Sequence, residues 1–189
     1  RSFNDLELRL PKLLARPAGG ACVAIQDDAE AVAPRIEVDL AYLDPPYNQH
    51  RYFTNYHVWE TIARWDSPEY YGVACKRADA RDAATRSPFN SRRTMPDALA
   101  TVIAQVRAET MVVSFSNEGF VPLADLVEMC AVRGHPVEVR AFDTRRYIGS
   151  RLGVFGPDGR RVGVPGPERN VEYVLISAPE PVREALATR

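Results

Sequence analysis

The sequence predicts an α/β fold built on a doubly wound, mostly parallel sheet with an antiparallel hairpin at one edge. Three observations favour this class. Five short apolar runs are spaced along the chain, helical patterns lie between several of them, and the last two runs have no helical pattern between them. At 189 residues, of which 46% are hydrophobic and 26% charged, the chain is long enough to bury one full core.

The apolar runs are predicted to form strands. In chain order they are Ala21–Ile25, Val38–Leu43, Met111–Ser116, Val137–Phe142 and Val171–Ser177. The first three are too continuously apolar to face water on one side, so buried parallel pairing is expected for them. The last two are expected to pair antiparallel, and the Gly-, Pro- and Arg-rich segment between them is expected to project from that edge as a hairpin.

The segments between the strands carry the periodicity of amphipathic helices. Residues 99–106 place four apolar side chains on one helix face, and Thr94 is expected to cap that helix. Residues 123–130 repeat the pattern, and Gly134 is expected to end the second helix. Trp59 and Trp65 are expected in the core.

The charge is nearly balanced overall but is unevenly distributed. With 24 basic and 25 acidic residues the formal net charge is -1, which argues against a protein that coats nucleic acid through bulk charge. Two basic stretches, 76–93 and 133–169, nevertheless suit a local contact with a polyanion. An ordinary solvated surface rich in arginine is the alternative.

Other function classes find little support in the sequence. No run reaches the roughly 18 consecutive apolar residues of a membrane helix, so a cytoplasmic protein without a membrane partner is expected. Cys22, Cys75 and Cys130 lie far apart and form no C-x-x-C pair, so no metal site is expected and the three are predicted to be small core residues.

The second apolar run ends in the turn Asp44-Pro45-Pro46-Tyr47. In an open α/β sheet, ligands bind beyond the carboxyl ends of the strands, and this turn follows such an end. The two prolines fix φ and donate no hydrogen bond, so the turn is stiff and its carbonyl groups are free for an outside donor. A carboxylate, a free carbonyl and a flat ring together match an amino group on a planar base. A proline-rich strand exit with a capping aspartate is the bland alternative.

These residues resemble a known family. The sequence "DPPY" after "LAYL", continued by "NQHRYFTNYHVWETIARWD", is similar to the DNA adenine methyltransferases of restriction-modification systems. The segments "CVAIQDDAEAV", "VVSFSNEG" and "ERNVEYVLIS" are similar to three further parts of that family, so the resemblance covers nearly the whole chain. It implies a Rossmann-like methyltransferase sheet, S-adenosylmethionine as cofactor and double-stranded DNA as substrate. A cognate restriction endonuclease is a candidate partner, and no metal is implied.

The resemblance also implies roles for single residues. Asp44 and the Pro45 carbonyl would accept hydrogen bonds from the target amine, Pro46 would stiffen the turn, and Tyr47 would stack on an adenine flipped out of the duplex. Asp28 matches the position that contacts the cofactor, and Asp27 is the alternative because the register is ambiguous; Asp44 and Pro45 would also adjoin the cofactor. The base pocket would be lined by Ser114, Ser116 and Asn117. The candidate DNA contacts are Asn48, Tyr52, Arg86, Arg92, Arg93, Arg145, Arg146, Arg151, Arg160 and Arg161.

One part of the family pattern is absent. The family carries a Phe-x-Gly-x-Gly loop after its first strand, and Gly19-Gly20 has neither the place nor the spacing of that loop. We therefore expect the first strands and this loop to lie outside the sequence or on another chain.

The resemblance and this gap predict the following organisation. Residues 1–178 are expected to form the later portion of a methyltransferase domain, with 66–95 and 143–170 as candidate DNA-recognition insertions and 179–189 as a C-terminal tail. Two alternatives stay open: a catalytically silent DNA-binding or partner subunit, and an enzyme that acts on cytosine, RNA or a protein amide.

Overall fold

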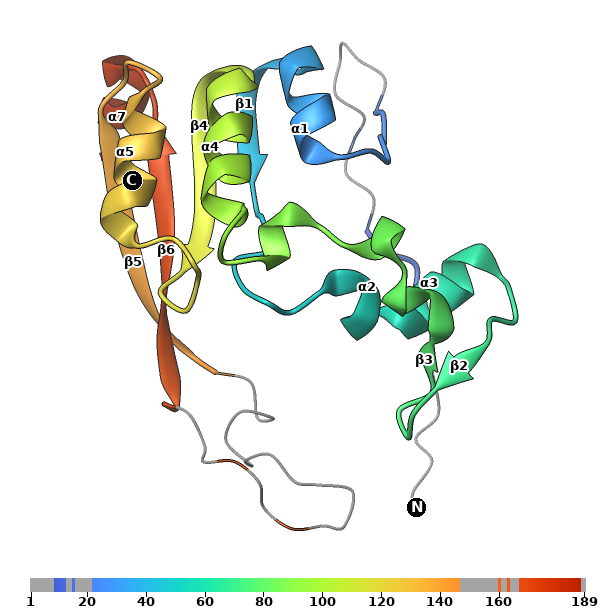
Figure 1. Cartoon of the computed structure of the whole chain (residues 1–189). Coiled ribbons are helices and arrows are strands. Elements are labelled where there is room, and N and C mark those ends of the chain that lie inside the picture. Colours follow the sequence, from blue (N-terminus) through green and yellow to red (C-terminus); the bar gives the residue numbers. More distant parts are fainter. Residues whose placement is uncertain are drawn as a thin grey trace.

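A four-stranded sheet lies at the centre of the computed structural model, which describes residues 9–12, 15, 22–146, 160, 163 and 167–187. The strand order is β1-β4-β6-β5 (Figure 1). The strands are β1 (Glu37–Leu43), β4 (Arg107–Ser116), β5 (Val137–Arg145) and β6 (Arg169–Ser177). β1 pairs with β4 in parallel, whereas β6 pairs antiparallel with both β4 and β5. Three strands therefore run in one direction, β6 runs against them, and the expected antiparallel pair is confirmed.

One predicted strand is wrong. Residues 22–25 form no strand, and all four are exposed. An isolated extended segment is not stable without a hydrogen-bonded neighbour, and no described strand lies beside this one. Most of the hairpin expected within 143–170 falls on residues outside the described part of the chain.

Two helices cover one face of the sheet. These are α4 (Met95–Gln105) and α5 (Leu123–Ala131), which lie in front of the sheet in Figure 1. Leu99, Ile103 and Leu126 are at most 1% exposed. They share one core with the strand residues Met111, Val113, Phe115 and Leu175. Because each fully buried residue of this size stabilises the fold by about 1.5–3 kcal/mol, this core holds β4 firmly in place.

The two predicted helix ends differ in outcome. Gly134 has a φ of 79°, a left-handed conformation that glycine adopts without strain, so the predicted stop of α5 is confirmed. Thr94 stands at the N-cap of α4, but its side chain makes no capping bond. Its hydroxyl instead donates to the Pro88 carbonyl at 2.8 Å, because the preceding 3₁₀ turn brings that carbonyl close.

Short elements connect the strands. Before β1 lie α1 (Ala29–Val32) and a 3₁₀ turn (Ala33–Arg35). The segment between β1 and α4, called here the lobe (residues 51–94), projects to the right in Figure 1 and contains most of the predicted insertion 66–95. Its elements are α2 (Tyr52–Asn55), α3 (His57–Arg64), β2 (Tyr70–Tyr71), β3 (Lys76–Arg77) and three 3₁₀ turns (Ala78–Arg81, Ala83–Thr85, Pro88–Asn90).

Several residues expected inside lie on the surface. Trp59 and Trp65 are 66% and 88% exposed, so the prediction that they belong to the core is wrong. An apolar residue is buried only where its side of the chain is covered by another element, and these two side chains remain largely in contact with solvent. Cys130 is buried as predicted, whereas Cys22 and Cys75 are exposed.

Part of the predicted C-terminal tail is helical, because residues 180–187 form α7 (Glu180–Ala187). None of the helices in the described part of the chain is long and apolar enough to cross a membrane.

Candidate active site

Asp44 lies at the carboxyl end of β1, beside the matching end of β4. The parallel register pairs Leu43 with Val113, so the next residue of each strand, Asp44 and Ser114, come together. The Ser114 hydroxyl donates a hydrogen bond to Asp44 Oδ1 at 2.9 Å. Asp44 is exposed, and its carboxylate keeps further acceptor sites for an outside donor.

Tyr47 is held by the residues that follow β4. Its carbonyl accepts a hydrogen bond from the Phe120 amide at 2.8 Å. Its ring packs edge-on against Phe115, with 5.9 Å between ring centroids and an interplanar angle of 62°. Burial, followed by the charges of Glu172 and Asp44, raises the pKa of the Tyr47 phenol above its usual value of 10.0, so the ring is neutral at physiological pH.

A small pocket lies between the turn and the helix layer. It has a volume of about 180 Å³ and is lined by Asp44, Pro45 and Ala29 together with apolar side chains of β1, the lobe and α4. Ala29 directly follows Asp28 in the chain. The pocket therefore lies beside Asp44 and next to the residue that follows Asp28.

The two neighbouring aspartates, Asp27 and Asp28, differ in their hydrogen-bond partners. The Asp27 carboxylate accepts hydrogen bonds from the Asp28 amide at 2.9 Å and from Arg35 Nη2 at 2.7 Å. These two bonds hold the pKa of Asp27 below its usual value of 3.8. Asp28 stands at the N-cap of α1, and its side chain makes no capping bond or other polar contact with the described residues. Asp27 thus has a structural partner, whereas Asp28 is available to a ligand.

The three base-pocket candidates lie in different surroundings. Ser114 reaches Asp44, as described above. Ser116 is fully buried, and its Oγ accepts hydrogen bonds from Asn170 Nδ2 at 3.3 Å and from the Glu118 amide at 3.4 Å. Asn117 bonds through both its backbone amide and its side-chain oxygen to Val171. Ser116 and Asn117 therefore join the end of β4 to the start of β6.

Sequence reasoning missed a polar group on β6. Asn170 is only 9% exposed, and its Nδ2 donates to Glu172 Oε1 at 2.5 Å as well as to Ser116. Thr144 of β5 donates to Asn170 Oδ1 at 2.8 Å. Glu172 is near enough to Tyr47 to raise the pKa of its phenol. The signal in the sequence was the pair of polar residues inside the apolar strand "RNVEYVLIS", since buried polar groups need specific partners.

The lobe is tied to the chain just beyond Tyr47. Asn90 Nδ2 donates to the carbonyl oxygens of Asn48 at 2.9 Å and His50 at 3.2 Å. Arg51 Nη2 donates to the carbonyl and the hydroxyl of Thr85 at 3.0 and 2.9 Å. The Asn48 side-chain oxygen accepts from the His50 amide at 2.9 Å, which closes a local turn. The position of this segment therefore depends on the lobe.

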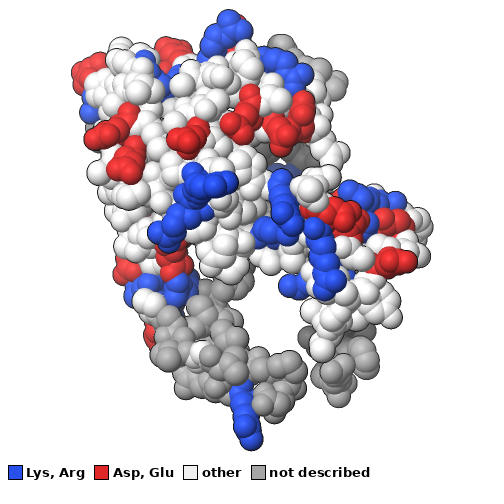
Figure 2. Space-filling model, viewed as in Figure 1, with Lys and Arg blue, Asp and Glu red and all other residues white. Residues whose placement is uncertain are grey.

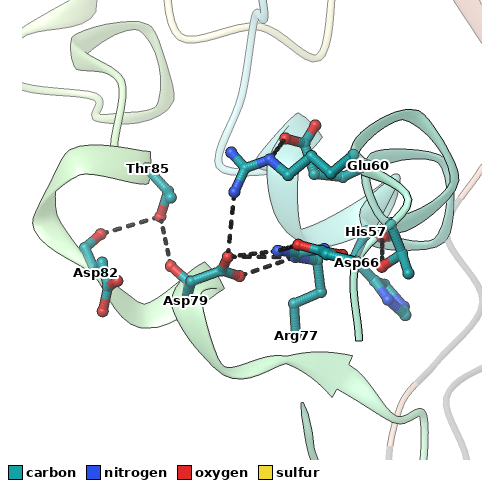
Figure 3. A network of polar contacts seen from close by, with 9 residues as sticks. His57, Glu60, Asp66, Arg77, Asp79, Asp82 and Thr85 are labelled. Atoms are coloured by element: carbon teal, nitrogen blue, oxygen red, sulfur yellow. Dashed lines mark hydrogen bonds and ion pairs between the residues drawn. The ribbon is translucent and has the colours of Figure 1, made fainter. Parts of the chain in front are cut away.

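A buried arginine organises the lobe itself (Figure 3). The Arg77 side chain is 3% exposed and bonds both carboxylate oxygens of Asp66, at 2.7 and 2.8 Å. It also bonds Asp79 at 2.8 Å and the Thr61 hydroxyl at 3.1 Å. These bonds hold the pKa values of Asp66 and Asp79 below the usual 3.8. Arg77 thereby joins α3 to β3 and to the 3₁₀ turn that follows, and it is not accessible to DNA.

Three of the candidate DNA contacts lie on the exposed side of the lobe. Arg86, Arg92 and Arg93 are exposed, and none forms an ion pair with the described residues. The Arg92 guanidinium lies over the Phe120 ring, 5.2 Å from its centroid, and the Phe120 amide holds Tyr47. Figure 2, which views the molecule from the same side as Figure 1, shows basic groups across the middle of the molecule, below a row of acidic groups.

The arginines near the end of β5 differ from these. Arg146 pairs with Glu118 and donates to the Pro167 carbonyl at 3.3 Å, so its charge is partly neutralised. Arg145 and Arg160 are exposed. Arg151 and Arg161 lie outside the described residues. Tyr52 is 51% exposed and packs edge-on against Tyr56 at a centroid distance of 5.8 Å.

Comparison with known proteins agrees with the resemblance in the sequence. The model of the family described as D12 class N6 adenine-specific DNA methyltransferase matches residues 5–94. This range contains the aspartate pair, the diproline turn and the lobe. No solved structure matches the chain significantly.

Curated relatives are modification methylases. The chain is 36% identical over 150 residues to modification methylase LlaI of Lactococcus lactis subsp. lactis, covering 78% of this chain and 23% of that protein. It is 29% identical over 116 residues to the type II methyltransferase M.FokI of Planomicrobium okeanokoites, covering 61% and 18%. It is 29% identical over 150 residues to modification methylase StsI of Streptococcus sanguinis, covering 78% and 22%. The chain thus spans about a quarter or less of the length of these relatives, and the predicted resemblance is confirmed.

Proposed function

We propose, from the relation of this chain to the D12 class N6 adenine-specific DNA methyltransferases, that it forms the base-recognition part of an enzyme that methylates adenine in double-stranded DNA. The observation that carries the proposal is the group of Asp44, Ser114 and Tyr47 at the carboxyl ends of β1 and β4. A stiff turn with a carboxylate, a free carbonyl and a supported neutral ring suits the edge and face of one adenine.

In this proposal the turn orients the target amine. Asp44 and the Pro45 carbonyl accept its two N–H groups, so its lone pair points away from the ring and toward the methyl group to be transferred. Tyr47 covers one face of the extruded base, and its neutral phenol allows close stacking. Ser114 orients the Asp44 carboxylate through the 2.9 Å hydrogen bond. The protein accelerates transfer chiefly by positioning.

The cofactor would be S-adenosylmethionine, which supplies a methyl group already activated on a sulfonium. The residues fit its nucleoside part, because the apolar pocket beside Asp44 and Pro45 is bounded by Ala29, next to the Asp28 carboxylate, which bonds none of the residues that the structure describes. We assign that contact to Asp28 and not to Asp27, whose carboxylate binds Arg35. The expected glycine loop and first strands remain part of the proposal, and they are compatible with β1, whose outer edge is unpaired among the described strands.

DNA would be held from the lobe side. Arg86, Arg92 and Arg93 are exposed and form no ion pair with the described residues, so their charges suit the phosphates that flank the extruded nucleotide. Because the relatives are named as modification methylases, a restriction endonuclease that shares the DNA site is the proposed partner, and the cytoplasm is the proposed location.

Transfer of labelled methyl groups from S-adenosylmethionine to unmethylated DNA tests the proposal. Asp44→Ala is expected to abolish transfer while thermal unfolding stays unchanged, because the Asp44 side chain is exposed and makes one hydrogen bond. Asp39→Ala, on β1 just before the turn and also exposed, is the matched control and should keep activity. Undiminished transfer in Asp44→Ala excludes the assigned role. The competing reading, a catalytically silent subunit, requires that titration with S-adenosylmethionine shows no binding.

A further inference from the structure

The turn after β4 holds a glycine directly against an aromatic ring. A β-carbon on Gly119 would overlap Cε1 of Phe115, would lie 2.7 Å from its Cζ and would lie 3.0 Å from the Ser116 carbonyl oxygen. Neighbouring atoms are essentially never found closer than 3.0 Å to a β-carbon. The space beside Gly119 is therefore available to the Phe115 ring only because residue 119 has no side chain.

The Phe115 ring has little room to move elsewhere. It is 1% exposed and belongs to the core formed by the sheet and helices α4 and α5. Protein interiors are close-packed, so a displaced core side chain pushes on its neighbours because there is no empty space to take up the movement. The same ring also meets Tyr47, in the edge-on contact with 5.9 Å between ring centroids. A group that pushed Phe115 away from Gly119 would therefore change the support under Tyr47.

The same turn holds the main chain of Tyr47. The Gly119 amide donates to the Ser116 carbonyl at 2.9 Å, which closes the turn, and the next amide, that of Phe120, donates to the Tyr47 carbonyl at 2.8 Å. Both the ring and the backbone of Tyr47 thus depend on residues 115–120.

We propose that Gly119 and Phe115 are positioning residues for Tyr47: the bare α-carbon of Gly119 makes the space for the Phe115 ring, and that ring sets the tilt of the Tyr47 ring. The inference rests on the proposed function, in which Tyr47 stacks on the extruded adenine. Neither residue touches the base, and both act through the ring that does.

A structural test needs no activity. The protein contains 8 tyrosines, and ¹⁹F NMR of the full chain labelled with 3-fluorotyrosine identifies Tyr47 by the signal that disappears in Tyr47→Phe. Gly119→Ala is expected to shift the Tyr47 signal and to leave the Tyr71 signal, assigned in the same way, in place. Ala104→Ser, at an exposed position of α4, is the control, because it adds one heavy atom, as Gly119→Ala does, without meeting the core. An unchanged Tyr47 signal in Gly119→Ala overturns the inference.

A second variant keeps the test valid if Gly119→Ala does not fold. Phe115→Leu removes the ring atoms that a β-carbon on residue 119 would overlap. The double variant Phe115→Leu/Gly119→Ala should therefore match Phe115→Leu within about twofold in methyl transfer and in the position of the Tyr47 signal. If the two substitutions instead reduce methyl transfer independently, so that their separate losses multiply in the double variant, the proposed coupling between residues 115 and 119 is overturned.

Kinetics then separate positioning from folding. Gly119→Ala is expected to lower kcat by about tenfold to a hundredfold, the usual effect of a displacement near 1 Å, with the KM for S-adenosylmethionine unchanged. In a Tyr47→Ala background the same substitution should have no further effect. Equal losses in both backgrounds overturn this inference but leave the proposed function standing, whereas full activity in Tyr47→Ala itself overturns the proposed role of Tyr47.

Discussion

The two hydrogen bonds from Asn90 are expected to hold the segment that follows the turn at residues 44–47. Asn90→Ala removes the donors to the Asn48 and His50 carbonyls, at 2.9 and 3.2 Å. A neutral hydrogen bond contributes about 0.5–1.5 kcal/mol, so two give about 1–3 kcal/mol. The second bond is exposed, which places the expected loss of unfolding free energy in the lower half of that range. Methyl transfer should fall as well, because the released segment begins directly after Tyr47.

Asn90→Asp sharpens this prediction. It places a carboxylate without a proton against the same two carbonyl oxygens, so at neutral pH it should destabilise more than Asn90→Ala. The same repulsion raises the pKa of the new carboxyl above the ordinary value of about 3.9, so the difference should shrink as the pH falls through that raised pKa. Urea unfolding at several pH values measures both effects. Asn55→Ala is the matched control, since Asn55 is exposed and its side chain bonds no described residue. The reasoning is refuted if Asn90→Ala is as stable as that control or if Asn90→Asp is no worse than Asn90→Ala.

Two further predictions concern charged groups. The Arg77 bonds lower the pKa values of Asp66 and Asp79 below 3.8, so their contribution to stability is complete above the unfolded value and is lost as the pH falls through the folded values. Urea unfolding between pH 2 and pH 6 should show this acid loss in the wild type but a much weaker one in Arg77→Gln, and identical profiles contradict the assignment. For DNA binding, Arg92→Gln should reduce the slope of log affinity against log salt by about 1, as expected for one lost phosphate contact. Arg146→Gln should change it less, because that guanidinium is already paired with a carboxylate, and the reverse order contradicts the proposed DNA surface.

Local patterns predicted the elements that surround the site. The continuous apolar runs marked four of the strands, and the 3.6-residue spacing marked α4 and α5, because burial in a sheet or against one helix face leaves a regular trace in the sequence. The same rule failed at residues 22–25, where an apolar run has no strand beside it among the described residues. The expectation that Trp59 lies in the core failed as well, because the size and apolar character of a side chain do not tell whether another element covers it.

The sequence by itself determined the chemical groups of the turn at residues 44–47. Prolines at 45 and 46 restrict the backbone wherever they occur, and an aspartate and a tyrosine on either side bring their carboxylate and ring with them. Only the tertiary structure decided which neighbouring groups are free. Arg35 engages Asp27 and leaves Asp28 open, Asn170 engages Ser116 from 54 residues away, and Gly119 makes room for Phe115. Such partners are chosen by the pairing of strands and the packing of the core, and no short stretch of sequence contains that information.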